Sequence, residues 1–327
     1  MRTFSSVFVL AALGVLGLAA GSAAAAPVVD TSNWKCESCP FEKGTSGSVE
    51  LGAGLVSEGS ARYGDATGLD RSHAIVNGDL RWRGDEGLWA DASASDLGLA
   101  VRTLSAQGGQ DGVYKLQFGY SELPHRLYDT GVTPFEGVGG SRLTLPFGPA
   151  ATTGAMPLAT TQQAADAGFD RKRIEAAATL QAVPEWSWRV NVRRDKRDGL
   201  QRMGASFFST SSQLLVPIDQ ATDEIEASGA YQSGTLRAGL GWQLSRFRNR
   251  AGSVTWDNPF TPVVAGATQG QLALAPSNDF HQVWAVAGWD PLPELQLSGE
   301  VAAGTMTQDA PFVDPTLNGT LGVTAAE

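Results

Sequence analysis

The chain of 327 residues is poor in the side chains that bind transition metals, with only two cysteines and three histidines. His73, His125 and His281 lie far apart, and none has a second ligand at a spacing typical of a metal site. The sequence also lacks the Gly-x-Ser-x-Gly turn of hydrolases and a glycine-rich phosphate loop between a strand and a helix. No enzyme signature remains, so we expect a protein without catalytic residues or a bound metal.

Positive charge is scarce as well. The chain has 24 lysines and arginines against 34 aspartates and glutamates, which gives a formal net charge of -10. Nucleic-acid binding depends on clustered lysines and arginines that neutralise phosphates. We therefore expect no nucleic-acid partner.

Long apolar runs are missing except near the N-terminus. Arg2 is followed by an apolar stretch at residues 7–20 and by small residues at 22–26, a pattern that predicts a secretory signal peptide over residues 1–26. The apolar stretch is shorter than the roughly 20 residues that a membrane-spanning helix needs. The sequence thus predicts an exported protein without helical membrane spans.

What the sequence does contain is alternation. From Ser48 onward apolar residues occupy every second position, which is typical of strands with one apolar and one polar face. About ten such segments of roughly 9 to 12 residues occur, the length at which a tilted strand crosses a bilayer. The alternating residues within these segments are found at 48–55, 79–83, 88–94, 114–120, 173–182, 186–193, 224–231, 236–244, 283–289 and 295–303.

The connections between these segments alternate in length. The joins at 84–87, 184–185, 233–234 and 290–293 are tight, whereas 123–169 and 246–279 are long and rich in Gly, Pro, Thr and Asn. Short turns on one side and long loops on the other are typical of outer-membrane barrels. We predict an all-β protein, an antiparallel transmembrane outer-membrane β-barrel, with a soluble β-sandwich as the alternative.

Charged residues in the polar positions are predicted to share one side of the sheet, which in a barrel is the lumen. They are Arg81, Arg83, Lys115, Arg173, Glu175, Arg189, Arg193, Glu224, Glu226, Arg237 and Glu300. Six tryptophans at or near predicted strand ends are expected to lie at the membrane interfaces. They are Trp82, Trp89, Trp186, Trp242, Trp284 and Trp289. Together these positions predict a polar interior and an aromatic girdle.

Cys36 and Cys39 form a Cys-x-x-Cys motif followed by Pro40. A c-type haem attachment site needs a histidine at that position, so no haem is attached here. In an oxidising periplasm the pair can form a disulfide, exchange with another thiol, or hold a metal with ligands from a partner. A thioredoxin-like role needs a βαβ setting that the strand pattern lacks. We interpret the pair as a structural or docking motif, with a periplasmic thiol oxidoreductase as a weaker alternative.

Asp65 and Asp70 are the remaining candidate ligands. Their carboxylates could bind a hard cation, but their spacing matches no calcium loop. We expect a solvated turn at residues 64–70.

Several longer strings carry a resemblance to a known family. They lie at residues 34–41, 49–69, 77–81, 114–120, 122–124, 223–227, 255–262 and 271–276. In this order they resemble the MtrB/PioB family of decahaem-associated outer-membrane proteins over nearly all of the mature chain.

The resemblance implies a barrel in the outer membrane of a Gram-negative bacterium that sheathes a periplasmic multihaem c-type cytochrome. Such a barrel would serve electron transfer across the membrane, for extracellular metal reduction or iron oxidation. The haem would be carried by the partner cytochrome and none by this chain. An extracellular multihaem cytochrome and outer-membrane lipid are the other implied partners. A solute-conducting porin without a cytochrome is the alternative function.

The strand count is small for that role. About ten strands enclose only a narrow interior, whereas a barrel that houses a cytochrome must be wide. We therefore expect residues 48–327 to form part of a larger barrel, an open sheet with unpaired edges. Residues 27–47, which contain Cys36 and Cys39, are expected to form a periplasmic N-terminal segment.

Overall fold

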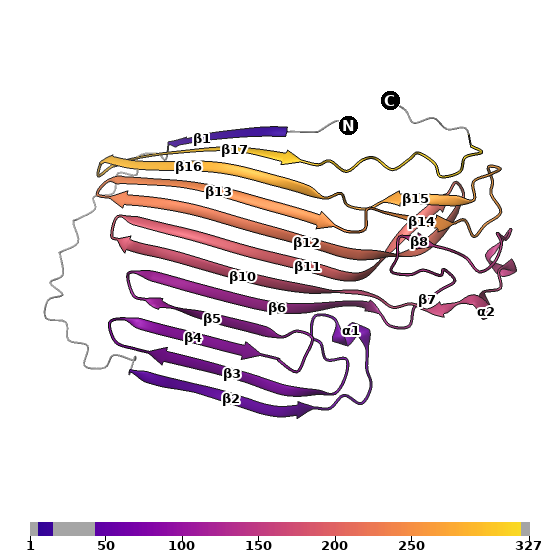
Figure 1. Cartoon of the computed structure of the whole chain (residues 1–327), viewed down its shortest axis with the longest axis horizontal. Helices are drawn as coiled ribbons and strands as arrows, with labels where there is room; N and C mark the ends of the chain where they lie inside the picture. The colour runs from indigo at the N-terminus through magenta and orange to yellow at the C-terminus, as the bar shows by residue number, and fades with distance from the viewer. Residues whose placement is uncertain (1–5, 16–42, 322–327) are drawn as a thin grey trace.

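A single large antiparallel sheet dominates the computed structural model, which describes residues 6–15 and 43–321 (Figure 1). The sheet has 12 strands in the order β1-β17-β16-β13-β12-β11-β10-β6-β5-β4-β3-β2. Neighbours in the sheet are mostly neighbours in sequence, as in an up-and-down barrel wall. The sheet is open, with β1 and β2 at its two edges. The predicted all-β fold and the open, incomplete barrel are confirmed.

The strands lengthen toward the middle of the sheet. Their bounds are β1 (Ser6–Val15), β2 (Gly44–Gly54), β3 (His73–Arg83), β4 (Leu88–Ser95), β5 (Thr103–Gln110), β6 (Tyr114–Tyr128), β10 (Ala167–Val183), β11 (Trp186–Phe207), β12 (Thr210–Ser233), β13 (Leu236–Asn249), β16 (Asn278–Leu292) and β17 (Leu295–Thr307). The predicted tight joins connect β3 to β4, β10 to β11, β12 to β13 and β16 to β17, all at one end of the sheet. We call this the turn end and the opposite one the loop end.

The β11–β12 hairpin continues well past its neighbours at the loop end. The two strands have 22 and 24 residues, and only residues 208–209 join them. At about 3.3 Å per residue this is roughly 70 Å, far more than the 9 to 11 residues that cross a bilayer. The sequence predicted that β11 would end near Arg193, but the charged residues that follow stay in register with β12.

The long loops fold onto this hairpin as a cap. They contain β7 (Val132–Thr133), β8 (Arg142–Leu143), β9 (Gln163–Ala164), β14 (Ser253–Asp257) and β15 (Gln269–Ala273), with short helices at Thr153–Ala155 and α2 (Leu158–Thr161). A further single helical turn, α1 (Ala61–Gly64), lies between β2 and β3. Among the described residues no helix is both long and apolar enough to span a bilayer.

Among the described residues, the most deeply buried side chains lie where the cap packs on the β11–β12 hairpin. Leu143, Leu214, Val216 and Val254 are the largest fully buried side chains, and they cluster with Trp256. Leu214 and Val216 come from β12, while the others come from β8 and β14. The cap is therefore a small folded unit whose hydrophobic core includes the hairpin.

Strand β1 lies within the predicted signal peptide. It pairs antiparallel with β17 over residues 6–15. An open strand edge offers unpaired N–H and C=O groups, and the backbone of another extended segment can pair with them. If the signal peptide is removed on export, as its sequence predicts, β17 becomes the edge.

Candidate functional site: the polar face of the sheet

The pairing register gives the sheet one apolar face. Residues directly opposite each other on neighbouring antiparallel strands point to the same side. Val190 pairs with Ala178 and Ala227, and the same face continues across the other strands. Its exposed apolar residues include Leu80, Leu116, Phe118, Ile174, Leu180, Trp188, Val190, Val192, Leu240, Val283, Leu297 and Val301. An exposed apolar band this wide is suited to lipid contact.

The opposite face is polar and contains the candidate site. The register places on it all eleven charged residues that the sequence assigned to the lumen. The prediction was therefore right for Arg81, Arg83, Lys115, Arg173, Glu175, Arg189, Arg193, Glu224, Glu226, Arg237 and Glu300. Side chains that tolerate water thus face away from the lipid.

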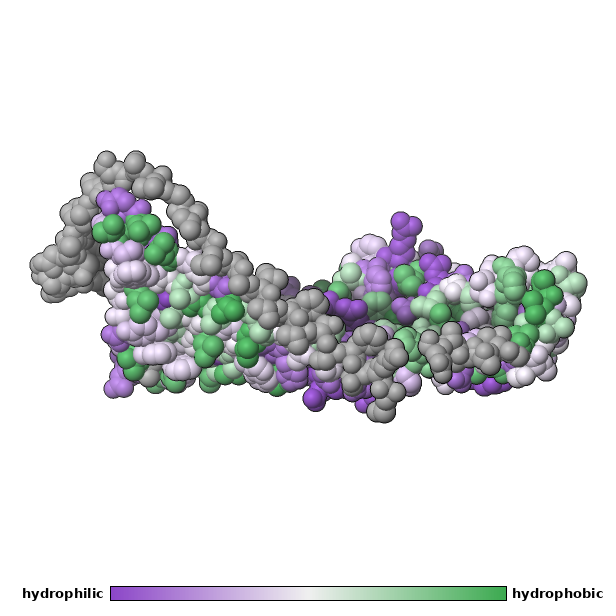
Figure 2. Space-filling view, turned by 90° about the horizontal axis from the view of Figure 1, so that it is seen from above, coloured by the Kyte–Doolittle hydropathy of each residue, from purple (hydrophilic) through white to green (hydrophobic). Residues whose placement is uncertain are grey.

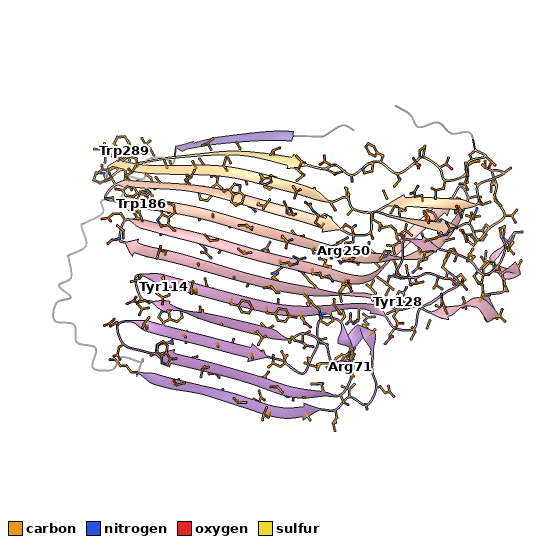
Figure 3. The ribbon with its side chains drawn as sticks, viewed as in Figure 1. Arg71, Tyr114, Tyr128, Trp186, Arg250 and Trp289 are labelled. Atoms are coloured by element: carbon orange, nitrogen blue, oxygen red, sulfur yellow. The ribbon has the colours of Figure 1, made fainter. Side chains whose placement is uncertain are left out.

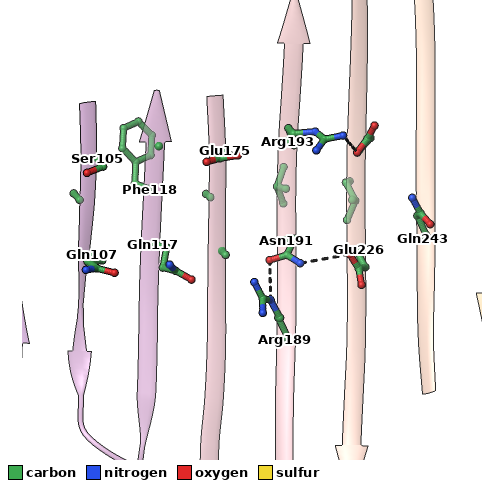
Figure 4. A pocket seen from close by; sticks show the side chains of 17 residues that line it. Ser105, Gln107, Gln117, Phe118, Glu175, Arg189, Asn191, Arg193, Glu226 and Gln243 are labelled. Atoms are coloured by element: carbon green, nitrogen blue, oxygen red, sulfur yellow. Dashed lines mark hydrogen bonds and ion pairs between the residues drawn. The ribbon is translucent and has the colours of Figure 1, made fainter. Parts of the chain in front are cut away.

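One row of polar side chains crosses this face nearly at right angles to the strands, and we call it the amide row. It consists of Asp91, Gln107, Gln117, Asn191, Glu226, Gln243 and Gln282, interrupted only by Ala177. Asn191 Oδ1 accepts a hydrogen bond from Arg189 Nε at 3.1 Å, and Asn191 Nδ2 donates to Glu226 at 3.5 Å (Figure 4). Part of the row lines an open hollow of about 510 Å³. It offers many hydrogen-bonding groups over a wide, shallow surface.

An arginine cluster lies next to the amide row, on the loop-end side. Arg171 and Arg173 on β10 both donate to Asp195 on β11, with Arg171 Nε 2.9 and 2.8 Å from the two carboxylate oxygens. Arg193 donates to Glu224 on β12. Asp195 is one of the few buried charged residues in the described part of the chain. Paired charges thus link three neighbouring strands on the polar face.

The tryptophans divide between the two faces. Trp186 and Trp289 lie at the turn end of the apolar face with Tyr114, as an interfacial girdle requires (Figure 3). Trp89 and Trp284 lie on the polar face, so the predicted girdle position is wrong for them. Trp89 is 5.7 Å from Lys115 Nζ and 5.8 Å from Arg83 Cζ, a cation–π arrangement.

The other predicted interface tryptophans are Trp82 and Trp242. Both lie on the apolar face, Trp82 next to the end of β3 and Trp242 in the middle of β13. Trp242 therefore lies within the exposed apolar band of the sheet and not at the edge of that band. Alternation alone could not separate these cases, because it does not show where along a strand the membrane boundary falls.

The remaining candidate residues take structural positions or lie outside the described part of the chain. Cys36 and Cys39 belong to the latter group, so their role stays a prediction. His125 Nδ1 lies 2.9 Å from Asp65 Oδ1, which also accepts the backbone N–H of Arg126. Asp65 thus ties the β2–β3 loop to β6 and is not part of a solvated turn.

The other two histidines and Asp70 take no part in the contact between Asp65 and His125. His73 Nδ1 lies 3.1 Å from the Arg71 carbonyl, and His281 packs near Trp242 on the apolar face. Asp70 contacts Arg71. Within the described residues no group of three or more His, Cys, Asp or Glu side chains is arranged to hold a metal.

The sequence matches a known family of outer-membrane proteins. Residues 56–326 match the model of the outer membrane beta-barrel porin family MtrB/PioB. The chain belongs to the MtrB/PioB family. It is an outer-membrane protein, and its apolar face suits contact with the membrane.

One sequence relative agrees with the family assignment. The chain is 30% identical over 289 residues to the outer membrane protein MtrB of Shewanella baltica, covering 87% of this chain and 41% of that protein. It thus spans less than half the length of this relative. Among solved structures it is similar to a loop-deletion mutant of OmpT from Vibrio cholerae (10% identity, 80% of this chain, 76% of that chain, TM-score 0.34). The toluene transporter TbuX of Ralstonia pickettii is another match (9% identity, 82% and 90%, TM-score 0.24).

Proposed function

We propose that this chain is part of a non-enzymatic outer-membrane barrel that sheathes a periplasmic multihaem c-type cytochrome and positions it for electron transfer across the membrane. The observation that carries the proposal is the polar face, where the amide row spans strands from β4 to β16. Such a surface suits contact with a second folded protein. The MtrB/PioB family relationship supports this partner class.

The charges of the polar face favour a protein partner over a flow of ions. Arg83 pairs with Asp91 at 2.7 Å, Arg173 with Asp195 at 3.1 Å, and Arg237 with Asp290 at 2.6 Å. Charges that are already paired cost less to bury under a partner than isolated charges do. The amides and hydroxyls between them can then form hydrogen bonds across the interface.

In this proposal the haem belongs to the partner. Electrons transfer efficiently only between closely spaced haems, so a cytochrome must itself extend through the membrane. The barrel supplies insulation from lipid on its apolar face and a docking surface on its polar face. It binds no cofactor of its own, and Cys36 and Cys39 act in folding or docking on the periplasmic side.

A solute-conducting porin is the second candidate. The family description as a porin and the open hollow of about 510 Å³ on the polar face favour it. In that case the polar face would be wetted by solvent and solutes, with no protein against it.

Purification from native membranes separates the two functions. The full-length protein, extracted in mild detergent, should carry a haem-staining protein and haem absorbance. Asn191→Trp, on the polar face, should reduce the co-purified haem several-fold. Val192→Trp, on the neighbouring apolar position, should leave it unchanged. Absence of haem from the wild-type protein, together with sugar passage in liposome swelling, would reject the sheath and support the porin.

A further inference from the structure

The apolar face becomes charged, with cations in excess, where the strands approach the loop end. On β11 the outward series Trp188, Val190 and Val192 is followed by Arg194 and Lys196. Charged residues replace apolar ones in the same row on β12, β13 and β16, because Arg194, Asp223, Arg246 and Asp279 lie in register. On β10 the change comes one row later, at Lys172, which pairs with Lys196. The change is thus shared by several neighbouring strands.

We call the two rows at this boundary the outer ledge. Its cations are Arg102, Lys172, Arg194, Lys196, Arg246 and Arg248, and its acids are Glu122, Asp223 and Asp279. The ledge is therefore positively charged, although the chain as a whole has a net charge of -10. Beyond it come Asp170, Asp198 and Asp219, which pair with Arg126, Lys196 and Arg250.

The cations of the ledge stay accessible although they have acidic neighbours. Arg194 lies 3.4 Å from Asp223, and the Arg194 side chain is 56% exposed. Arg246 and Arg248 share the single carboxylate of Asp279, at 2.9 and 2.8 Å. Arg194 and Arg246 have N–H groups left to donate to another anion. In Arg248 the Nη1 group already donates to the Phe247 and Asn278 carbonyls and the Nη2 group to Asp279, which leaves its Nε–H.

The position of the ledge matches a membrane boundary. Trp186, in the girdle at the turn end, and Arg194 are eight residues apart, about 26 Å along the strand before tilt is considered. Outward apolar bands of outer-membrane barrels are about 25 Å tall. The ledge lies at the loop end, and the long loops of such barrels are extracellular. Figure 2 shows hydrophobic residues in the turn-end half and again at the far loop end, with hydrophilic residues gathered between them.

We propose that the outer ledge binds the phosphate groups of phosphorylated outer-leaflet lipid and thereby fixes the depth of the barrel in the membrane. Guanidinium groups bind phosphate through paired, charge-assisted hydrogen bonds. The ledge adjoins the lipid-facing band on the same face, so the anion within its reach is a lipid headgroup. This inference does not depend on a cytochrome partner.

The test uses the purified full-length protein in detergent with a phosphorylated lipid A or the same lipid with its phosphates removed. Native mass spectrometry measures the lipid retained. The wild type should retain the phosphorylated lipid and bind the other at least tenfold more weakly. In the variant Arg194→Gln/Arg246→Gln/Arg248→Gln, affinity should fall about fivefold for each cation removed. The matched variant Arg189→Gln/Arg193→Gln/Arg237→Gln, on the polar face, should bind within about twofold of the wild type.

Three results would overturn the proposal. They are equal binding of the two lipids, a ledge variant that binds like the wild type, and complete displacement of the lipid by millimolar inorganic phosphate, which would indicate a site for free anions. Heat-modified mobility in gels reports whether each variant is folded. Should the ledge variant not fold, the comparison of the two lipids on the wild-type protein decides the question.

Discussion

Arg171 on β10 shares its single Nε–H between the two carboxylate oxygens of Asp195 on β11, at 2.9 and 2.8 Å, and its Nη2 also donates to Asp195, in the most buried charge pair of the polar face. Asp195→Asn would leave Arg171 and Arg173 without a carboxylate. We expect the free energy of unfolding to fall by about 1 to 3 kcal/mol, measured by urea titration in lipid vesicles. Asp198→Asn, an exposed site on the same strand, should cost less than about 0.5 kcal/mol. Equal effects would show that the buried pair has no special role.

Gly241 makes room for the indole ring of Trp284, which lies opposite it on the polar face. A Cβ atom at residue 241 would overlap that ring. Gly241→Ala should therefore destabilise the sheet by about 1 to 3 kcal/mol and shift the fluorescence of Trp284. Gly204→Ala is the control, because a Cβ atom there meets nothing within 4 Å. If Gly241→Ala left the stability of the sheet unchanged, the Trp284 ring would not pack against this glycine.

Val190 and Asn191 are consecutive residues on opposite faces of β11, halfway between the girdle and the outer ledge. An arginine that faces lipid at mid-membrane costs about 2 to 4 kcal/mol, whereas one that faces the lumen is tolerated. Val190→Arg should therefore lower the stability of the barrel in vesicles by that amount, and Asn191→Arg should change it by less than about 1 kcal/mol. If Asn191→Arg destabilised the barrel more than Val190→Arg does, residue 191 would face lipid and residue 190 the lumen.

Leu214 is fully buried where the β11–β12 hairpin meets the cap. Leu214→Ala should destabilise the cap by about 2 to 5 kcal/mol and expose the loops at 123–169 and 246–279 to protease, while the membrane strands stay protected. Phe208→Ala, at the hairpin tip where the side chain is 79% exposed, should have no measurable effect on cleavage. If both variants are cleaved at the wild-type rate, the packed cap does not form in solution.

Alternation predicted the strands best where an apolar and a polar residue strictly succeed each other. It placed Val190, Asn191 and their neighbours on the correct faces because one register slip would move every side chain to the wrong side. It missed β5, where Ala106, Gly108 and Gly109 give too little contrast between the faces. The sequence of β5 alone therefore does not show alternation between apolar and polar residues.

Other features depend on contacts that are distant in sequence. The extension of β11 is possible because its charged residues pair with β12, and the cap core joins Leu143 to Val254 and Leu214. The outer ledge appears only when residues of six strands are brought into register. Periodicity within one segment contains none of this information.

The central claim is that the polar face lies against a multihaem cytochrome and the apolar face against lipid. Introducing a photo-cross-linking amino acid at residue 191 or at residue 190 of the full-length protein in native membranes tests it most directly. We predict that the residue 191 probe forms an adduct that stains for haem, and that the residue 190 probe forms none. Haem-free adducts from residue 191, or a haem-stained adduct from residue 190, would contradict the account.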